Sequence, residues 1–94
     1  MMVRGIGALH NFILKHVDCS GAIKSWLKEV KNDQWNSFHD IKKKYASASN
    51  LGEKVVVFNI KGNCYRLEVK VNYQLGVVLI KRIGTHDEYL RWNL

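Results

Sequence analysis

The sequence predicts an α+β fold: N-terminal helices packed on one face of a small, twisted, mainly antiparallel sheet, followed by a short C-terminal helix or turn. One observation is a change of period near residue 50, where apolar residues at helical spacing give way to the alternating or continuous apolar runs typical of strands. The other is that the 94 residues include no proline, internal repeat or low-complexity linker. We therefore expect residues 1–94 to form a single domain.

The first half is expected to contain a short edge strand and three helical segments. Residues 2–6 form the strand, and residues 8–17 form the first helix. The next four residues end that helix, and Ser20 is the expected N-cap of the second helix. Lysines 42–44 end the third helix, where positive charge suits the helix dipole. The expected apolar faces are Leu9, Phe12, Ile13 and Val17, then Ile23, Trp26, Leu27 and Val30, and then Trp35, Phe38 and Ile41.

The second half is expected to contain a hairpin and a third strand. After a loop over 46–52, the expected strands cover 54–60, 63–73 and 76–83. Lys61-Gly62 is a tight-turn signal, so the hairpin should have a two-residue loop with Ile60 facing Asn63. In that register one face is apolar throughout: Val56, Phe58, Ile60, Tyr65, Leu67, Val69 and Val71. The helices should cover this face, which leaves an open polar face with Arg66 near its centre.

Charge and composition narrow the classes of partner. Fifteen Lys and Arg residues against eight Asp and Glu residues give a formal charge of +7. Such an imbalance attracts RNA, DNA, ribosomes or acidic proteins. No apolar run approaches the ~20 residues that span a bilayer, and the first residues lack a signal-peptide pattern, so we expect a cytoplasmic protein that does not contact membranes. Cys19 and Cys64 lack partners at zinc-site spacing, so we expect reduced thiols and no metal.

An ordered set of short motifs resembles the HigB family of type II toxins, within the RelE/ParE superfamily. The segment FNIKGNCYRL is followed by RIGTHDEY, and upstream lie Trp26, the Trp35-x-x-Phe38-x-Asp40 pattern and a Ser-Ala pair. The resemblance implies a RelE-like fold and an mRNA endonuclease that acts on messages being translated on the ribosome. It also implies a HigA-like antitoxin as inhibitor, contact with DNA only through the toxin–antitoxin complex, and no cofactor.

The resemblance also points to site residues. Arg66 matches the strand arginine that contacts the scissile phosphate in RelE-like ribonucleases, and an arginine fork can bind two phosphate oxygens. His86 belongs to the Thr-His motif, and a histidine suits proton transfer because its ordinary pKa lies near neutrality. Tyr89 matches a C-terminal tyrosine implicated in base stacking. Further candidate RNA contacts are Lys61, Lys70, Lys81 and Arg82.

These residues have structural alternatives. Arg66 would pair with Glu68 or be solvated, Tyr89 would pack in the core, and Thr85 is more plausibly an N-cap than a catalytic group. The Glu88 of the motif has no evident role. The nuclease hypothesis requires that the side chains of Arg66 and His86 converge on one solvent-facing pocket.

One departure from the family affects the mechanism. RelE has lysines on the preceding strand that are credited with acid/base work, and Val57 and Asn59 occupy those positions here. His86 is then the best remaining base for the ribose 2′-OH in a metal-free cleavage. Three alternatives stay open: a ParE-type toxin that binds DNA gyrase, a non-catalytic RNA-binding module, and a degenerate, inactive toxin.

Overall fold

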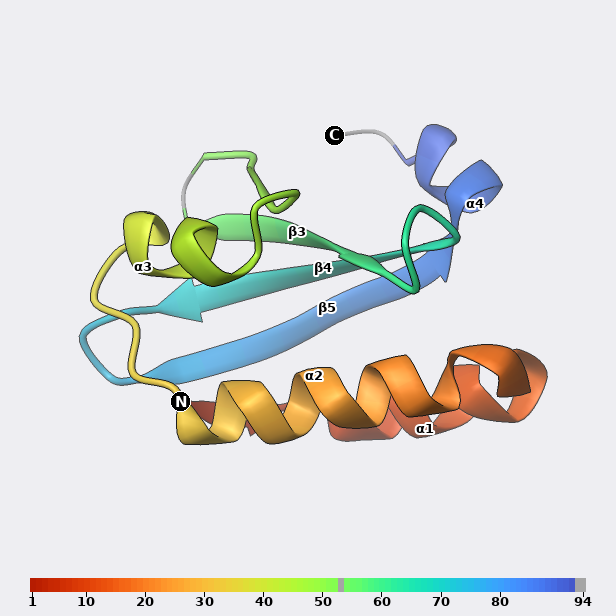
Figure 1. Cartoon of the computed structure of the whole chain (residues 1–94), viewed down its shortest axis with the longest axis horizontal. Coiled ribbons are helices and arrows are strands. Elements are labelled where there is room, and N and C mark those ends of the chain that lie inside the picture. Colours follow the sequence, from red (N-terminus) through yellow and green to blue (C-terminus); the bar gives the residue numbers. More distant parts are fainter. Residues whose placement is uncertain (53, 93–94) are drawn as a thin grey trace.

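The computed structural model describes residues 1–52 and 54–92, which form a five-stranded sheet with helices on both faces (Figure 1). The strand order across the sheet is β1-β5-β4-β3-β2. All neighbouring strands are antiparallel except β1 and β5. The elements in chain order are β1 (Met2–Arg4), α1 (Ile6–Lys15), a 3-10 turn (Val17–Cys19), α2 (Ser20–Asn32), α3 (Phe38–Lys44), β2 (Ser49–Asn50), β3 (Val55–Ile60), β4 (Tyr65–Asn72), β5 (Val77–Thr85) and α4 (His86–Leu90).

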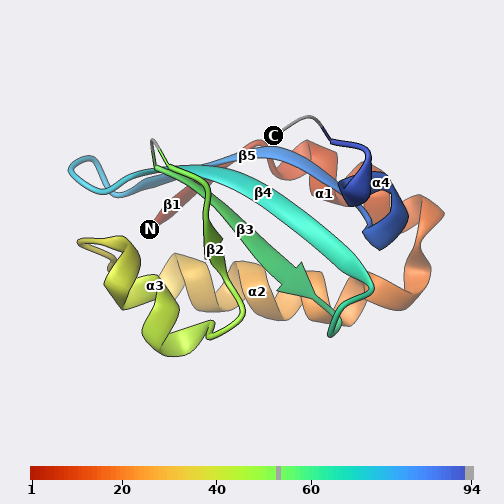
Figure 2. The same ribbon diagram turned by 90° about the horizontal axis from the view of Figure 1, so that it is seen from above.

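The helices divide between the two faces of the sheet. Helices α1 and α2 run side by side across one face, and the short α4 lies on the other face, beyond the end of β5 (Figure 1). Helix α3 lies near β2, at the opposite end of the molecule from α4 (Figure 2). The predicted α+β class is confirmed, with N-terminal helices, a mostly antiparallel sheet and a short C-terminal helix.

The core lies between the sheet and the first two helices. All seven residues of the predicted apolar face are buried, and α1 and α2 cover them with Leu9, Ile23, Trp26 and Val30. Phe58 is 1% exposed, and its ring centroid lies 5.3 Å from that of Trp26. Burying a side chain of this size stabilises the fold by about 1.5–3 kcal/mol, so this face fixes which side of the sheet remains available for function.

The hairpin register differs from the prediction by two residues. The loop has four residues, Lys61 to Cys64, and Ile60 pairs with Tyr65 rather than Asn63. Lys61 and Gly62 both adopt left-handed backbone, with φ of 53° and 66°, and the N–H of Cys64 donates to the Lys61 carbonyl at 3.3 Å, which closes a wider turn. Because side chains alternate with period two, the shift leaves every residue on its predicted face.

Three local predictions in the first half are also wrong. Helix α1 ends at Lys15, and Val17 is 72% exposed in the 3-10 turn instead of belonging to the apolar stripe. Ser20 is the first residue of α2, whose N-cap is Cys19, and no side chain caps it. The Cys19 thiol instead donates to the carbonyl of His16. The segment expected to be a loop contains the two-residue β2.

Candidate functional site

The candidate site lies where β4 and β5 meet α4, on the face of the sheet turned away from α1 and α2. Arg66 on β4 pairs with Gly84 on β5, and two residues along Glu68 pairs with Arg82. A β-bulge follows this pair, because Val69 pairs with Ile80. The bulge changes which β5 residues share this face, so that Arg66, Glu68, Arg82 and Gly84 lie together beneath α4.

Arg66 is held by the backbone of its own hairpin. Its Nη1 donates to the carbonyls of Asn63 and Tyr65, at 3.0 and 3.2 Å. Its Cζ lies 5.3 Å from the ring centroid of Tyr89. The side chain is 8% exposed, so Arg66 lies beneath Tyr89 at one end of the sheet and not on an open centre as predicted.

Part of the guanidinium still reaches solvent. Within residues 1–52 and 54–92, Arg66 makes no hydrogen bond through Nε or Nη2. In the same residues, the only fully buried side-chain nitrogen or oxygen without a partner is Trp26 Nε1. The Nε and Nη2 of Arg66 are therefore not fully shielded from solvent, and they are the donors that remain for an anion while Nη1 stays fixed.

A capping box sets the position of α4. Thr85 Oγ1 accepts from the Glu88 N–H at 3.1 Å, and Glu88 Oε1 accepts from the Thr85 N–H at 2.9 Å. The interpretation of Thr85 as an N-cap is confirmed, and Glu88 gains the role that the sequence did not reveal. The N–H of Thr85 also lowers the pKa of the Glu88 carboxyl, because it stabilises the charged form.

His86 follows the cap directly and is the first residue of α4. Its backbone N–H donates to the Cys64 carbonyl at 2.9 Å, which ties the start of α4 to the loop that leads into Arg66. The imidazole is exposed and, among the residues the structure describes, makes no hydrogen bond or ion pair. The structure thus brings Arg66 and Tyr89 into contact and attaches the His86 backbone beside them. It shows no direct contact between His86 and Arg66 side chains.

A second cation lies on an aromatic ring beside the first. The Arg82 Nε donates to Glu68, and its Cζ lies 4.2 Å from a ring centroid of Trp92. Glu68 therefore pairs with Arg82 and not with Arg66, which was the structural alternative for that carboxylate. Trp92 also meets Tyr89 edge to face at 5.4 Å. Sequence reasoning missed Trp92, although an aromatic residue three positions after Tyr89 in a helical segment was the available signal.

Gly84 makes room for this arrangement. A Cβ built on Gly84 would lie 2.9 Å from Cζ2 of Trp92 and 3.2 Å from Cβ of Glu88. Real Cβ atoms do not approach carbon that closely, so α4 and Trp92 can lie over the sheet here only because this position has no side chain.

The predicted lysine contacts lie in three separate places. Lys61 is in the hairpin loop and pairs with Asp18, with Nζ 2.9 Å from Oδ2. Lys81 is exposed beside the bulge and lies near Lys15 of α1, in a hollow between that helix and β5. Lys70 is exposed further along β4, away from α4.

The Asp18 carboxylate joins the hairpin to the helices. It accepts from Lys61 and, at 2.7 Å, from the hydroxyl of Tyr65, and these two donors lower the pKa of Asp18. The same contact raises the pKa of Tyr65 to about 12, because the carboxylate opposes ionisation of the phenol. His16 adds its ring to this cluster, 5.5 Å from Tyr65, and so is not a plain surface histidine. The cluster anchors one side of the loop that leads into Arg66.

The strand before Arg66 supplies no acid or base. Asn59 pairs across the ladder with Arg66, and its amide donates to the side chain of Asn63 at 3.3 Å, while Val57 is buried. Within the described ranges, no group of three His, Cys, Asp or Glu side chains gathers as a metal site requires. Cys19 and Cys64 are free, the first buried and the second exposed. None of the described helices is both long and apolar enough to cross a bilayer.

Comparison with known proteins supplies the family. No curated protein matches the chain. The family model for the HigB toxin, described as the RelE-like toxic component of a toxin–antitoxin system, matches residues 19–92. That match runs from the N-cap of α2 through Trp92 and includes Arg66, His86 and Tyr89. The chain therefore belongs to the HigB family, the RelE-like toxins of toxin–antitoxin systems.

Proposed function

We propose that this toxin is a cytoplasmic, metal-independent ribonuclease that cleaves translated mRNA on the ribosome and is inhibited by a HigA-like antitoxin. The observation that carries the proposal is the arrangement of Arg66, whose Nη1 is fixed by two carbonyls under the ring of Tyr89, while Nε and Nη2 have no partner among the described residues. A guanidinium that is already oriented can bind the oxygens of one phosphodiester group through its remaining donors. The formal charge of +7 favours the approach of RNA.

Arg66 would stabilise the phosphate as charge builds up during cleavage. Attack of the ribose 2′-OH on the adjacent phosphorus forms a cyclic phosphate and releases the 5′ oxygen of the next nucleotide. The pentacoordinate phosphorus carries more negative charge on its free oxygens than the starting diester. Because Arg66 is 8% exposed and already oriented, its interaction with those oxygens is little weakened by water or by reorganisation.

His86 and Tyr89 would supply the proton transfer and the base contact. The 2′-OH must lose a proton and the 5′ oxygen must gain one, and Val57 and Asn59 do neither. His86 is exposed and is the histidine nearest in the chain to Tyr89, and its backbone N–H donates to the Cys64 carbonyl in the loop before Arg66. One face of the Tyr89 ring meets Arg66, and a splayed base can stack on what remains accessible.

The test is primer extension on mRNA after brief induction, together with purified toxin on translated and untranslated messages. Arg66→Ala should lower cleavage about 10²–10³-fold, as loss of one oriented donor does elsewhere. His86→Ala should lower it about 10²–10⁴-fold, and Tyr89→Ala about 10-fold or more. Lys28→Ala on the exposed side of α2 is the matched control and should cleave as the parent does.

Two results would contradict the proposal. Cleavage by Arg66→Ala at the parent rate would remove the phosphate role, and an unchanged rate for His86→Ala would remove that residue from the mechanism. A parent protein that stops growth without new 5′ ends inside reading frames would be a toxin that acts by binding. Cleavage of untranslated RNA at the same rate would show that the ribosome is not required.

A further inference from the structure

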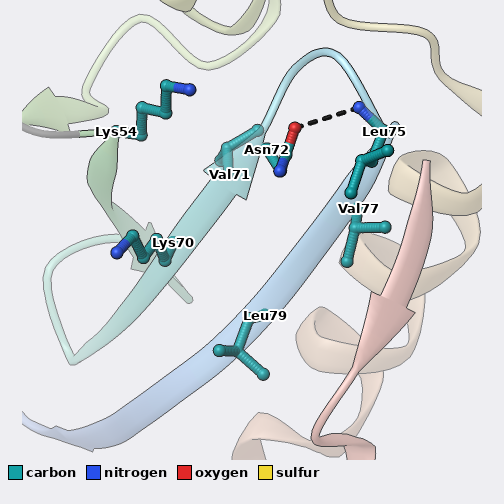
Figure 3. Close-up of a pocket in the computed structure, with 7 residues that line it drawn as sticks. All are labelled: Lys54, Lys70, Val71, Asn72, Leu75, Val77 and Leu79. Carbon is teal, nitrogen blue, oxygen red and sulfur yellow. Dashed lines mark hydrogen bonds between the residues drawn. The ribbon is translucent and has the colours of Figure 1, made fainter.

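A hollow lies over β4, β5 and the turn between them (Figure 3). It is on the same face of the sheet as Arg66, because Lys70 and Asn72 follow Arg66 at even spacing on β4, and it is at the end of β4 away from α4. It encloses about 540 Å³ and is lined by Lys54, Lys70, Asn72, Leu75, Val77 and Leu79. At the usual rise of a strand, Lys70 is about 13 Å along β4 from Arg66. The hollow is therefore separate from the candidate catalytic residues.

Two large apolar side chains at the hollow are exposed to solvent. Leu75 is 74% exposed and Leu79 is 45% exposed. Asn72 accepts a hydrogen bond from the Leu75 N–H at 3.0 Å, which fixes the β4–β5 turn with this leucine at the rim (Figure 3). Leu79 lies on β5, on the other side of the bulge from Arg82. It pairs directly with Lys70 on β4. Leu75, Val77 and Leu79 follow one another along the turn and β5 at this hollow (Figure 3), and exposed apolar side chains grouped in this way mark a candidate protein-binding surface.

The charge of the side chains at the hollow indicates which class of molecule would bind there. Lys54 and Lys70 line the same hollow, Lys70 directly across the ladder from Leu79, and in the described residues neither lysine forms an ion pair. A second copy of this chain would place these lysines against their equivalents and would repel. RNA would gain little from the aliphatic leucines, which cannot stack on bases as aromatic rings do. A protein segment with apolar side chains beside carboxylates complements both features.

We infer that this hollow is a docking site for the antitoxin, which contributes an acidic segment whose apolar side chains contact Leu75 and Leu79. A toxin of a toxin–antitoxin system has such a partner, and the surface complements an acidic one. The segment contributes side chains to the face of the sheet and does not add a strand, because the hollow is not at an edge. The inference rests on the family and not on the cleavage mechanism.

The test measures the affinity of purified toxin variants for the antitoxin of the same system. Leu75→Ser with Leu79→Ser removes apolar contact without changing charge, and binding should weaken about 100-fold. The control is Leu14→Ser, because Leu14 is 79% exposed on α1 and lies outside the hollow. In cells the doubly substituted toxin should stop growth as the parent does, and the antitoxin should no longer neutralise it.

A second pair of variants tests the charge. Lys54→Glu with Lys70→Glu should weaken binding at least 10-fold at low salt, and less in high salt. Lys24→Glu with Lys28→Glu makes the same change in net charge on α2 and should bind almost as the parent does. These exposed substitutions leave the core intact, so the result holds even if the leucine variant folds poorly.

Three outcomes would overturn the inference. The first is parent affinity in either hollow variant, and the second is an equal loss in the matched controls. The third is a parent dimer that the leucine substitutions convert to monomers, which would assign the surface to a second copy. Arg66→Ala should bind the antitoxin with parent affinity whether or not the toxin cleaves RNA, so the two proposals can fail separately.

Discussion

Gly84→Ala adds one methyl group directly beneath Trp92, across the ladder from Arg66. On its own, replacing a strand glycine by alanine would stabilise the protein by about 0.5–1 kcal/mol, because the unfolded chain loses freedom. The new Cβ would however lie 2.9 Å from Trp92 Cζ2, and overpacking of this kind costs about 1–3 kcal/mol. The expected net effect is a loss of up to about 2.5 kcal/mol, or up to roughly 12 °C in Tm for a domain of this size.

The assay is thermal and urea unfolding of four proteins: the parent, Gly84→Ala, Trp92→Ala and the double variant. If Trp92 causes the cost, Gly84→Ala should be clearly less destabilising in the Trp92→Ala background, with a coupling of about 1 kcal/mol. Equal effects in both backgrounds, or a more stable Gly84→Ala protein, would refute the close packing of Trp92 on Gly84. Cleavage should fall as well, because displacement of α4 moves Tyr89 away from Arg66.

Three further predictions concern the rest of the molecule. The pKa of Asp18 lies below its ordinary 3.8 in the folded protein, so its stabilising contribution is present above that pH and is lost as the pH falls. Asp18→Asn should therefore flatten the loss of stability between about pH 5 and pH 2, as measured by urea unfolding, and an unchanged slope would contradict the role of this carboxylate. Iodoacetamide should label Cys64 alone in the folded protein and Cys19 only after unfolding, which intact mass would show as one and then two adducts. Phe58→Ala should cost about 3–5 kcal/mol in urea unfolding, and a cost below 1 kcal/mol would mean that the ring is not central to the core.

The hairpin shows what a single sequence can predict about this fold. The face of each strand residue is predictable, because the alternation of apolar and polar side chains admits only one burial pattern. The pairing is not, because a two-residue shift preserves that pattern, and positive φ at Lys61 and Gly62 suits a two-residue turn as well as the observed four-residue loop. The prediction that Val17 belongs to the first helix is wrong for a similar reason. Its spacing matches the apolar stripe of that helix, but the helix ends at Lys15.

The sequence predicts which residues form the candidate site better than it predicts how they are placed relative to one another. The motifs identify Arg66 and Tyr89, and the structure places them in contact. The bulge in β5 has no sequence signal, yet it determines which β5 residues lie beside Arg66. The pairing of Glu68 with Arg82 depends on that bulge. Proximity in the sequence alone suggested Arg66 as the partner of Glu68, which is wrong.

The parallel pairing of β1 with β5 has a consequence for how the toxin is made. Residues 2–4 pair with residues 77–79, so the first strand has no partner in the sheet until β5 has been synthesised. Because β5 lies between β1 and β4, the order of strands cannot be completed by any shorter nascent chain. A nascent chain that lacks β5 therefore leaves the first strand unpaired, and any activity that depends on the complete sheet has to wait until β5 has been made.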